Sequence, residues 1–421
     1  MRRKRRTTCF VVAWAKGEIV LSRERVLKAI DHEEPDRVPI DVGGTRQSGI
    51  AASTYHRLKQ HLGIDTPTRV YDVYQMLAEI ERPIMERFGA DVVGLNRQRV
   101  AFGIRNDQGW KPWTLFDGTP VEVPRGFSPE PEPNGDLVLR HPDGSLMARM
   151  PKGGHYFDRL DKYPGAAHAD PDSLDLPIIS DEECDYLRAQ AEAYRQNTDF
   201  AIIAPFGPPY ELFFGLGTGD FSAWMMTLAT EPEYVHRLYE RLTEAWIENL
   251  RKFTAAVGDL IDIIQFNDDL GTQEAPFLSP NMFRELVFPY YKRGLDWIHE
   301  HTNLKVFMHN DGAIYPFIPT LIEMGVDILN PVQTTAKGMD PAKLKHEFGD
   351  RLTFWGAACD CQKTLPFGTP DEVAAEVEAT LEVLAPGGGY VLASVHNIQA
   401  NVPPENVVAL FDTALSKGRY G

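Results

Sequence analysis

Residues 352–393, which read LTFWGAACDCQKTLPFGTPDEVAAEVEATLEVLAPGGGYVLA, indicate the fold class. Two short apolar segments, 352–355 and 389–393, enclose a helix-length stretch. Within that stretch Thr369 is a favourable N-cap, Pro370 suits the first helical position and Glu372 follows three residues after the cap. The apolar residues that follow recur at helical spacing: Val373, Val377, Leu381 and Leu384. The pattern predicts a strand, a helix and a second strand.

The same alternation extends over most of the chain. Eight short β-branched or apolar segments are separated mainly by stretches with apolar residues every three or four positions. They are residues 37–41, 91–95, 199–204, 260–265, 304–309, 326–330, 352–355 and 389–393. Buried parallel strands that alternate with amphipathic helices indicate an α/β protein. Eight of them, with no Gly-x-Gly-x-x-Gly after the first, favour a (β/α)8 TIM barrel over an open sheet.

Two regions depart from this alternation. Residues 98–160 contain turn sequences at 116–118, 133–136 and 142–144, which predict hairpins in a β-rich insertion. Residues 1–21 combine a basic start with a short apolar run, and we expect a disordered tail there rather than a signal peptide. A helix is predicted over 22–30, with Ser22 as its N-cap. We therefore predict a single barrel domain over residues 22–421.

Composition excludes several classes of partner. The 421 residues include 43 Lys and Arg against 60 Asp and Glu, for a net charge of −17. Nucleic acids and anionic membranes need clustered cations, so this balance argues against both. No segment approaches the ~20 uninterrupted apolar residues of a membrane span. The 4 cysteines are scattered, which fits a reducing compartment, and we expect a cytoplasmic protein.

Reactive side chains follow four of the predicted strands. They lie in residues 267–273, 309–312, 359–362 and 396–399. Because catalytic residues of barrels sit where strands end, these carboxylates, imidazoles and thiols are expected to share one mouth. There they could bind a divalent metal, or serve as general acid and base for a bound substrate.

Each of these residues also has a structural explanation. The alternatives are helix capping for Asp268, Asp269 and His396, a core position for His309, and a small buried hydrophobic role for Cys359. Likewise, Tyr210 and Phe214 could line a cleft for a flat ligand or pack in the core. The shared position of the polar residues at strand ends favours a functional role for the set.

Several motifs resemble those of the uroporphyrinogen decarboxylase superfamily. They lie at residues 23–27, 34–39, 71–73, 366–370, 396–398 and 403–406. The resemblance covers essentially residues 22–418. It implies a (β/α)8 barrel with a deep cleft at the carboxyl ends of its strands, in agreement with the pattern.

The superfamily has a decarboxylase branch, which removes acetate carboxylates from a tetrapyrrole without metal or cofactor. Resemblance to this branch points to Asp72, whose carboxylate would face the pyrrole NH groups, and to His396. Such enzymes bind the substrate carboxylates through an arginine-rich segment, where residues 43–49 of this chain hold only Arg46. Because unpaired charges in a cleft are costly, a polyanionic tetrapyrrole is the less favoured substrate.

The other branch contains cobalamin-dependent methyltransferases, which residues 268–273 and 309–312 resemble. Members that methylate thiols hold zinc with a His-x-Cys pair and a distant cysteine. Here the pair is His309-x-Asp311, and glycine stands near position 388 in place of the late cysteine. Members that demethylate methoxylated substrates need a Lewis acid on the ether oxygen, and zinc held by His309, Asp311 and Cys359 would supply it.

We therefore predict a methyltransferase that moves a methyl group from a small O-methyl compound to a corrinoid on a partner protein, with zinc assistance. The alternatives are a tetrapyrrole decarboxylase and a non-catalytic barrel that binds a small molecule or a corrinoid. A homodimer is expected from the family. The predicted catalytic residues are Asp72, Asp269, His309 and His396, and the predicted substrate-binding residues are Asn267, Asp268, Gln273, Tyr210 and Phe214.

Overall fold

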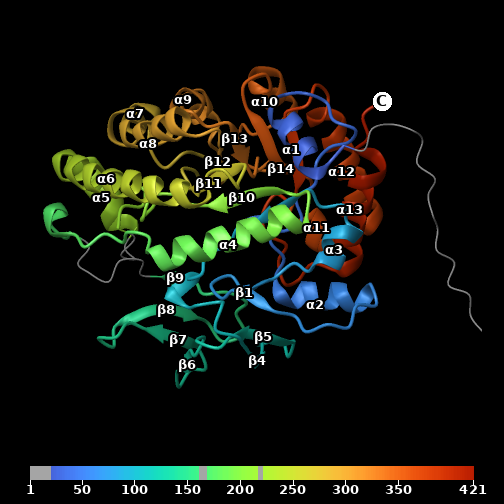
Figure 1. Ribbon diagram of the computed structural model, residues 1–421, viewed down its shortest axis with the longest axis horizontal. Helices are drawn as coiled ribbons and strands as arrows, with labels where there is room; N and C mark the ends of the chain where they lie inside the picture. Colours follow the sequence, from blue (N-terminus) through green and yellow to red (C-terminus); the bar gives the residue numbers. More distant parts are fainter. Residues whose placement is uncertain (1–19, 161–167, 217–220) are drawn as a thin grey trace, which may run out of the picture.

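A curled parallel sheet forms the centre of the computed structural model, which describes residues 20–160, 168–216 and 221–421 (Figure 1). In spatial order its strands are β15 (Tyr390–Ala393), β14 (Thr353–Ala357), β13 (Ile328–Asn330), β12 (Lys305–His309), β11 (Ile263–Asn267), β10 (Ala201–Pro205) and β3 (Val92–Gly94). All neighbouring pairs are parallel. Each strand coincides with a predicted one, and the α/β barrel prediction is confirmed.

The eighth predicted strand, residues 37–41, closes the sheet without becoming a full strand. Ile40 forms a parallel bridge with Leu392 of β15, and the N–H of Asp41 donates to the Leu392 carbonyl at 2.9 Å. On the other side, the N–H of Asp91 donates to the Ile40 carbonyl at 2.8 Å, next to β3. The two edges of the sheet are therefore tied to one segment, which we call the seam (residues 37–41).

Helices surround this sheet (Figure 1). The longer ones after α1 (Ser22–Ile30) are α2 (Ala52–His61), α4 (Asp181–Asn197), α5 (Phe221–Thr230), α6 (Pro232–Val257), α8 (Phe288–His301), α10 (Pro341–Phe348), α12 (Pro370–Leu384) and α13 (Pro404–Lys417). The shorter ones are α3 (Arg82–Arg87), α7 (Pro280–Leu286), α9 (Ile318–Met324) and α11 (Thr364–Phe367). Across the described ranges, no helix combines the length and apolar character that crossing a membrane requires.

Two predicted helix starts had different outcomes. The capping box at α12 is present: Thr369 accepts from the N–H of Glu372, and the Glu372 side chain accepts from the N–H of Thr369. The prediction of Ser22 as an N-cap is wrong, because the cap position is Leu21 and Ser22 is already helical. The N–H of Ser22 instead donates to the carboxylate of Asp199 at 3.0 Å, a contact that no local pattern predicts.

Strand alternation places one apolar cluster inside the barrel. The strand residues in it are Val92, Ala201, Ile203, Ile263, Phe307, Ile328, Trp355, Val391 and Ala393. They pack with Val26, Ala29 and Ile30 of α1. The carbonyl of Ala29 accepts from the N–H of Gly389, just before β15, so α1 covers the amino end of the barrel. The opposite end is left for polar side chains.

The predicted insertion is β-rich and lies in the lower part of the view in Figure 1. A hairpin pairs β4 (Trp110–Thr114) with β5 (Pro120–Pro124). A four-stranded antiparallel sheet contains β6 (Glu130–Pro131), β7 (Leu137–Arg140), β8 (Leu146–Met150) and β9 (Arg159–Leu160). The small ladder of β1 (Val70–Asp72) and β2 (Leu77–Ala78) was not predicted. Residues 1–19, most of the expected tail, lie outside the described ranges.

Candidate active site

A pocket of about 900 Å³ opens at the carboxyl ends of the barrel strands. The predicted site residues in its wall are Tyr210, Phe214, Asn267, Asp268, Asp269, His309 and His396. Residues 100–103 and Met147 of the β-rich insertion contribute to the wall as well. The pocket is therefore enclosed by strand ends on one side and by the insertion on another.

Strand register explains why polar residues meet here. Asn267, His309 and Asn330 lie opposite one another on β11, β12 and β13. Two residues earlier, Phe307 and Ile328 belong to the cluster inside the barrel. Because side chains two positions apart on a strand share a face, His309 and Asn330 also point inward, at the end of the barrel where its apolar filling stops.

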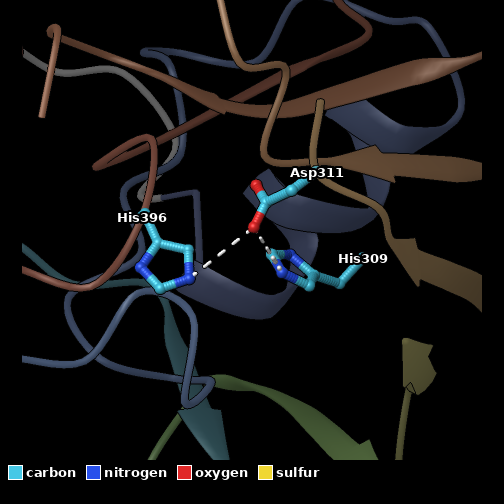
Figure 2. A group of neighbouring side chains, drawn as sticks. All are labelled: His309, Asp311 and His396. Carbon is cyan, nitrogen blue, oxygen red and sulfur yellow. Dashed lines mark ion pairs between the residues drawn. The ribbon is translucent and has the colours of Figure 1, made fainter. Parts of the chain in front are cut away.

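Two imidazoles and a carboxylate form a compact group, the His–Asp–His cluster (His309, Asp311 and His396), drawn in Figure 2. The Asp311 Oδ2 atom lies 3.5 Å from His309 Nε2 and 3.7 Å from His396 Nε2. Candidate ligand atoms of the three side chains all lie within 4.8 Å of one another. Such a set of nitrogen and oxygen donors could hold a metal ion.

Hydrogen bonds to neighbouring asparagines orient both imidazoles as metal ligands. The amide nitrogen of Asn330 donates to the Trp355 carbonyl at 2.9 Å, so its Oδ1, 2.6 Å from His309 Nδ1, acts as the acceptor. His396 Nδ1 lies 3.0 Å from the Oδ1 of Asn397 in the same way. Each neutral ring therefore carries its proton on Nδ1 and presents the Nε2 lone pair toward Asp311, the arrangement that a metal ligand needs.

The electrostatics of the cluster favour positive charge. Burial alone would lower the pKa of His309, but the carboxylates of Asp311 and Asp269 raise it to about 9. Burial opposes ionisation of Asp311, yet His309 holds the pKa of that carboxyl below its usual value. Burial also raises the pKa of Asp269, whose Oδ1 accepts from the N–H of Asp311 at 3.0 Å. A proton on His309 occupies the position that a metal cation would take.

Asp268 is not a helix cap. The next helix along the chain, α7, begins with Ser279 as its N-cap. Asp268 is buried, and its Oδ2 accepts from the hydroxyl of Tyr291 at 2.6 Å and from the N–H of Phe213 at 2.7 Å. Burial and the nearby Glu211 raise the pKa of Asp268 well above its usual value.

Three predicted site residues belong neither to the cluster nor to the pocket wall. Cys359 is buried, and its Sγ donates to Glu376 Oε2 of α12 at 3.5 Å. Burial and Glu376 raise the pKa of this thiol, so it remains protonated. Gln273 is exposed, and its backbone carbonyl accepts from the backbone N–H of Lys337 at 2.9 Å. Neither Cys359 nor Gln273 lines the pocket.

Asp72 is the third, and its carboxylate already accepts three hydrogen bonds. Its Oδ1 accepts from the N–H groups of Tyr74 and Gln75, each at 2.9 Å. Its Oδ2 is paired with the guanidinium of Arg46. The side chain is buried, and it is Arg46 rather than Asp72 that reaches the pocket wall.

Sequence reasoning missed two residues of the site. Asn330 ends a strand that was predicted correctly, so its position at a strand end was a usable signal. Glu211 follows Tyr210 directly, lines the pocket, and accepts from the side-chain amide of Asn267 at 2.6 Å. Tyr210 and Phe214 were predicted to lie in the site because of their rings, whereas Glu211, which lies between them in the sequence, was not predicted.

Comparison with known proteins identifies the family. Residues 155–416 match the model described as uroporphyrinogen decarboxylase (URO-D). The uroporphyrinogen decarboxylase of Alkalilimnicola ehrlichii is 23% identical over 401 residues, covering 93% of each chain. That of Xylella fastidiosa is 27% identical over 411 residues, covering 93% of this chain and 98% of its own. A methyltransferase from Methanosarcina mazei shares the fold with a TM-score of 0.58 at 18% identity, over 94% of this chain and 99% of its own. Because the family model spans more than half of the sequence, the chain belongs to the uroporphyrinogen decarboxylase (URO-D) family.

Proposed function

We propose that this protein is a methyltransferase that moves a methyl group from a small O-methyl compound to a corrinoid carried by a partner protein. The observation that carries this function is the His–Asp–His cluster, whose two histidines lie in the wall of a pocket of about 900 Å³. A set of metal ligands suits ether activation, whereas decarboxylation in this superfamily proceeds without metal. The shared fold of the Methanosarcina mazei methyltransferase adds support.

The ligand atoms would be the Nε2 atoms of His309 and His396 and the Oδ2 atom of Asp311. Zinc accepts such mixed nitrogen and oxygen sets. Bound there, it would supply Lewis-acid chemistry to the ether oxygen of the donor. Cys359 is not needed in this set, because its thiol is protonated and bonded to Glu376.

Asp269 has the properties of a proton donor for the leaving group. It lies in the pocket wall, and its Oδ1 is 3.9 Å from His309 Nε2. Burial raises the pKa of its carboxyl, so the acid form persists closer to neutral pH than for an ordinary aspartate. As the bond between methyl carbon and oxygen breaks, the oxygen takes the Asp269 proton and leaves as an alcohol.

The pocket is poorly suited to a tetrapyrrole with many carboxylates. Among the lining residues that the structure describes, Arg46 is the one Lys or Arg, and that guanidinium is paired with Asp72. Glu211, Asp268 and Asp269 lie in the same wall, so its described part offers a polyanion acids rather than further cations. Asp72 is buried outside the pocket wall, and its carboxylate already accepts from two N–H groups and from Arg46.

Metal analysis tests the proposed function. After loading with zinc, the wild type should retain about one zinc per chain and His309→Ala should lose it. Cys359→Ala is the matched control and should retain zinc. The loaded wild type should also transfer methyl from 2-methoxyphenol to reduced cobalamin, and His309→Ala should not.

Two results would contradict it. One is a wild type that retains no metal after loading. The other is decarboxylation of uroporphyrinogen at an appreciable rate, which would favour the decarboxylase. If the protein is a non-catalytic barrel, it should bind a ligand, and neither the wild type nor His309→Ala should transfer methyl groups.

A further inference from the structure

We propose that Tyr291 is a positioning residue, which holds residues 209–216 in the pocket wall through Asp268 and thereby sets the affinity for the methyl donor. The hydrogen-bonded set of Leu212, Phe213, Asp268 and Tyr291 is called the clamp. The effect on the donor rests on the proposed function. The effect on residues 209–216 is a separate property, which can be measured without any reaction.

Residues 209–216 follow β10 and form one side of the pocket. The lining residues among them are Pro209, Tyr210, Glu211, Phe214 and Leu216. The segment is neither helix nor strand, so no regular ladder of backbone hydrogen bonds fixes its place. Its position relative to the barrel therefore depends on contacts with other elements.

The clamp joins this segment to two elements of the barrel. The hydroxyl of Tyr291, on α8, donates to Asp268 Oδ2 at 2.6 Å. The N–H of Phe213 donates to the same oxygen at 2.7 Å, and the N–H of Leu212 donates to the Tyr291 hydroxyl oxygen at 3.2 Å. Two consecutive backbone N–H groups are thus held by one pair of side chains, one from α8 and one from the end of β11.

The clamp lies in the interior of the protein. Leu212, Phe213 and Tyr291 are fully buried, and Asp268 is 1% exposed. The Phe213 carbonyl accepts from the indole N–H of Trp224 at 2.5 Å, and Trp224 lines the pocket as well. Breaking buried hydrogen bonds leaves polar groups unsatisfied, which is costly. The clamp therefore holds the segment, and with it the Trp224 side of the wall, in one arrangement.

Backbone hydrogen bonds tie Asp268 separately to the strand end that carries the His–Asp–His cluster. The N–H of Asp268 donates to the His309 carbonyl at 3.1 Å. Asp269, the next residue, accepts from the N–H of Asp311 at 3.0 Å. Neither bond involves the Tyr291 hydroxyl. Removal of that hydroxyl should consequently loosen residues 209–216 and leave the metal ligands in place.

Tyr291 acts on the donor only through the clamp, because it does not line the pocket. Its ring packs against Phe266 and Trp246, with centroid distances of 5.2 Å and 5.9 Å. Tyr291→Phe keeps this packing and removes the hydroxyl. Tyr390→Phe is a matched control, because Tyr390 is also fully buried and its hydroxyl donates to the Gly356 carbonyl at 2.8 Å, outside the pocket wall.

Hydrogen–deuterium exchange, read by mass spectrometry on the full chain, tests the clamp. In Tyr291→Phe, peptides that contain Leu212 and Phe213 should exchange at least about tenfold faster than in the wild type. Asp268→Ala, which removes the acceptor shared by Tyr291 and Phe213, should accelerate the same peptides. Tyr390→Phe should leave them unchanged. In the methyl-transfer assay, Tyr291→Phe should raise KM for 2-methoxyphenol more than it lowers kcat, with zinc affinity unchanged.

Several results would overturn the clamp. They are wild-type exchange of residues 209–216 in folded Tyr291→Phe, equal acceleration of these residues in Tyr390→Phe, and a loss of zinc affinity in Tyr291→Phe as large as the rise in KM. Failure of the proposed function looks different. A wild type that transfers no methyl groups contradicts that function, and the exchange of residues 209–216 then still supports or rejects the clamp.

Discussion

Replacing Asn330 with alanine should weaken zinc binding without touching a ligand. Asn330 is 1% exposed, and its Oδ1 lies 2.6 Å from His309 Nδ1. Without it, the imidazole is free to rotate and to place its proton on Nε2, the atom that faces Asp311. Loss of such an outer partner lowers metal affinity by about 10–100-fold. That factor corresponds to about 1.4–2.8 kcal/mol.

The same substitution should also destabilise the metal-free protein. The hydrogen bond to His309 is lost, and the Trp355 carbonyl loses its donor at 2.9 Å. An unsatisfied buried group costs about 1–3 kcal/mol. Asn406→Ala is a matched control, because this 1% exposed asparagine donates to the carbonyls of Leu365 and Gly368, each at 2.8 Å, away from the pocket wall.

Competition with a chromophoric chelator gives zinc affinity, and denaturant titration gives the free energy of unfolding. We expect both variants to lose stability and only Asn330→Ala to lose zinc affinity. A zinc Kd within about twofold of wild type for Asn330→Ala would refute the reasoning, as would an equal loss in Asn406→Ala.

Three further predictions address the thiol, the pH dependence and the packing. Cys359→Ala should leave the zinc Kd unchanged in the chelator competition, because the Cys359 thiol donates to Glu376 and is not needed as a ligand. A larger Kd in this variant would place the thiol among the zinc ligands. Since the pKa of His309 is raised from 6.5 to about 9, zinc must displace a proton there, and apparent affinity should rise up to about tenfold per pH unit and level off above that value. In the metal-free protein the stability from this shift is fully present below pH 6.5 and is lost as the pH rises through about 9, which unfolding titrations would detect as falling stability. Gly294→Ala should lower stability by about 1–3 kcal/mol, because its Cβ would lie 2.0 Å from a ring carbon of Trp246; an unchanged unfolding midpoint would contradict this.

The fold was largely predictable because local patterns are strong in this chain. Buried strands read as continuous apolar runs, and the hairpin turns 116–118, 133–136 and 142–144 place glycines where the backbone needs positive φ. Polar residues directly after these runs pointed to the mouth of the barrel, where His309 and His396 do line the pocket.

The partners of the site residues could not be predicted, since they depend on contacts between distant segments. The bond between His309 and Asn330 requires the register of two strands, which neither segment encodes alone. Cys359 lies beyond the end of β14, where strand alternation no longer fixes side-chain direction, and it turns toward α12. Asp72 is neutralised by Arg46, from a loop 26 positions earlier in the chain.

The seam has a consequence for biosynthesis. Residues 37–41 are made well before Leu392, to which Ile40 is bridged. The ring of strands therefore cannot close before Leu392 has left the ribosome, and the nascent sheet keeps two unpaired edges until then. Open edges template pairing with other chains. A premature stop before residue 392 should accordingly yield an aggregating sheet rather than a smaller barrel, because the partner of the seam is then missing.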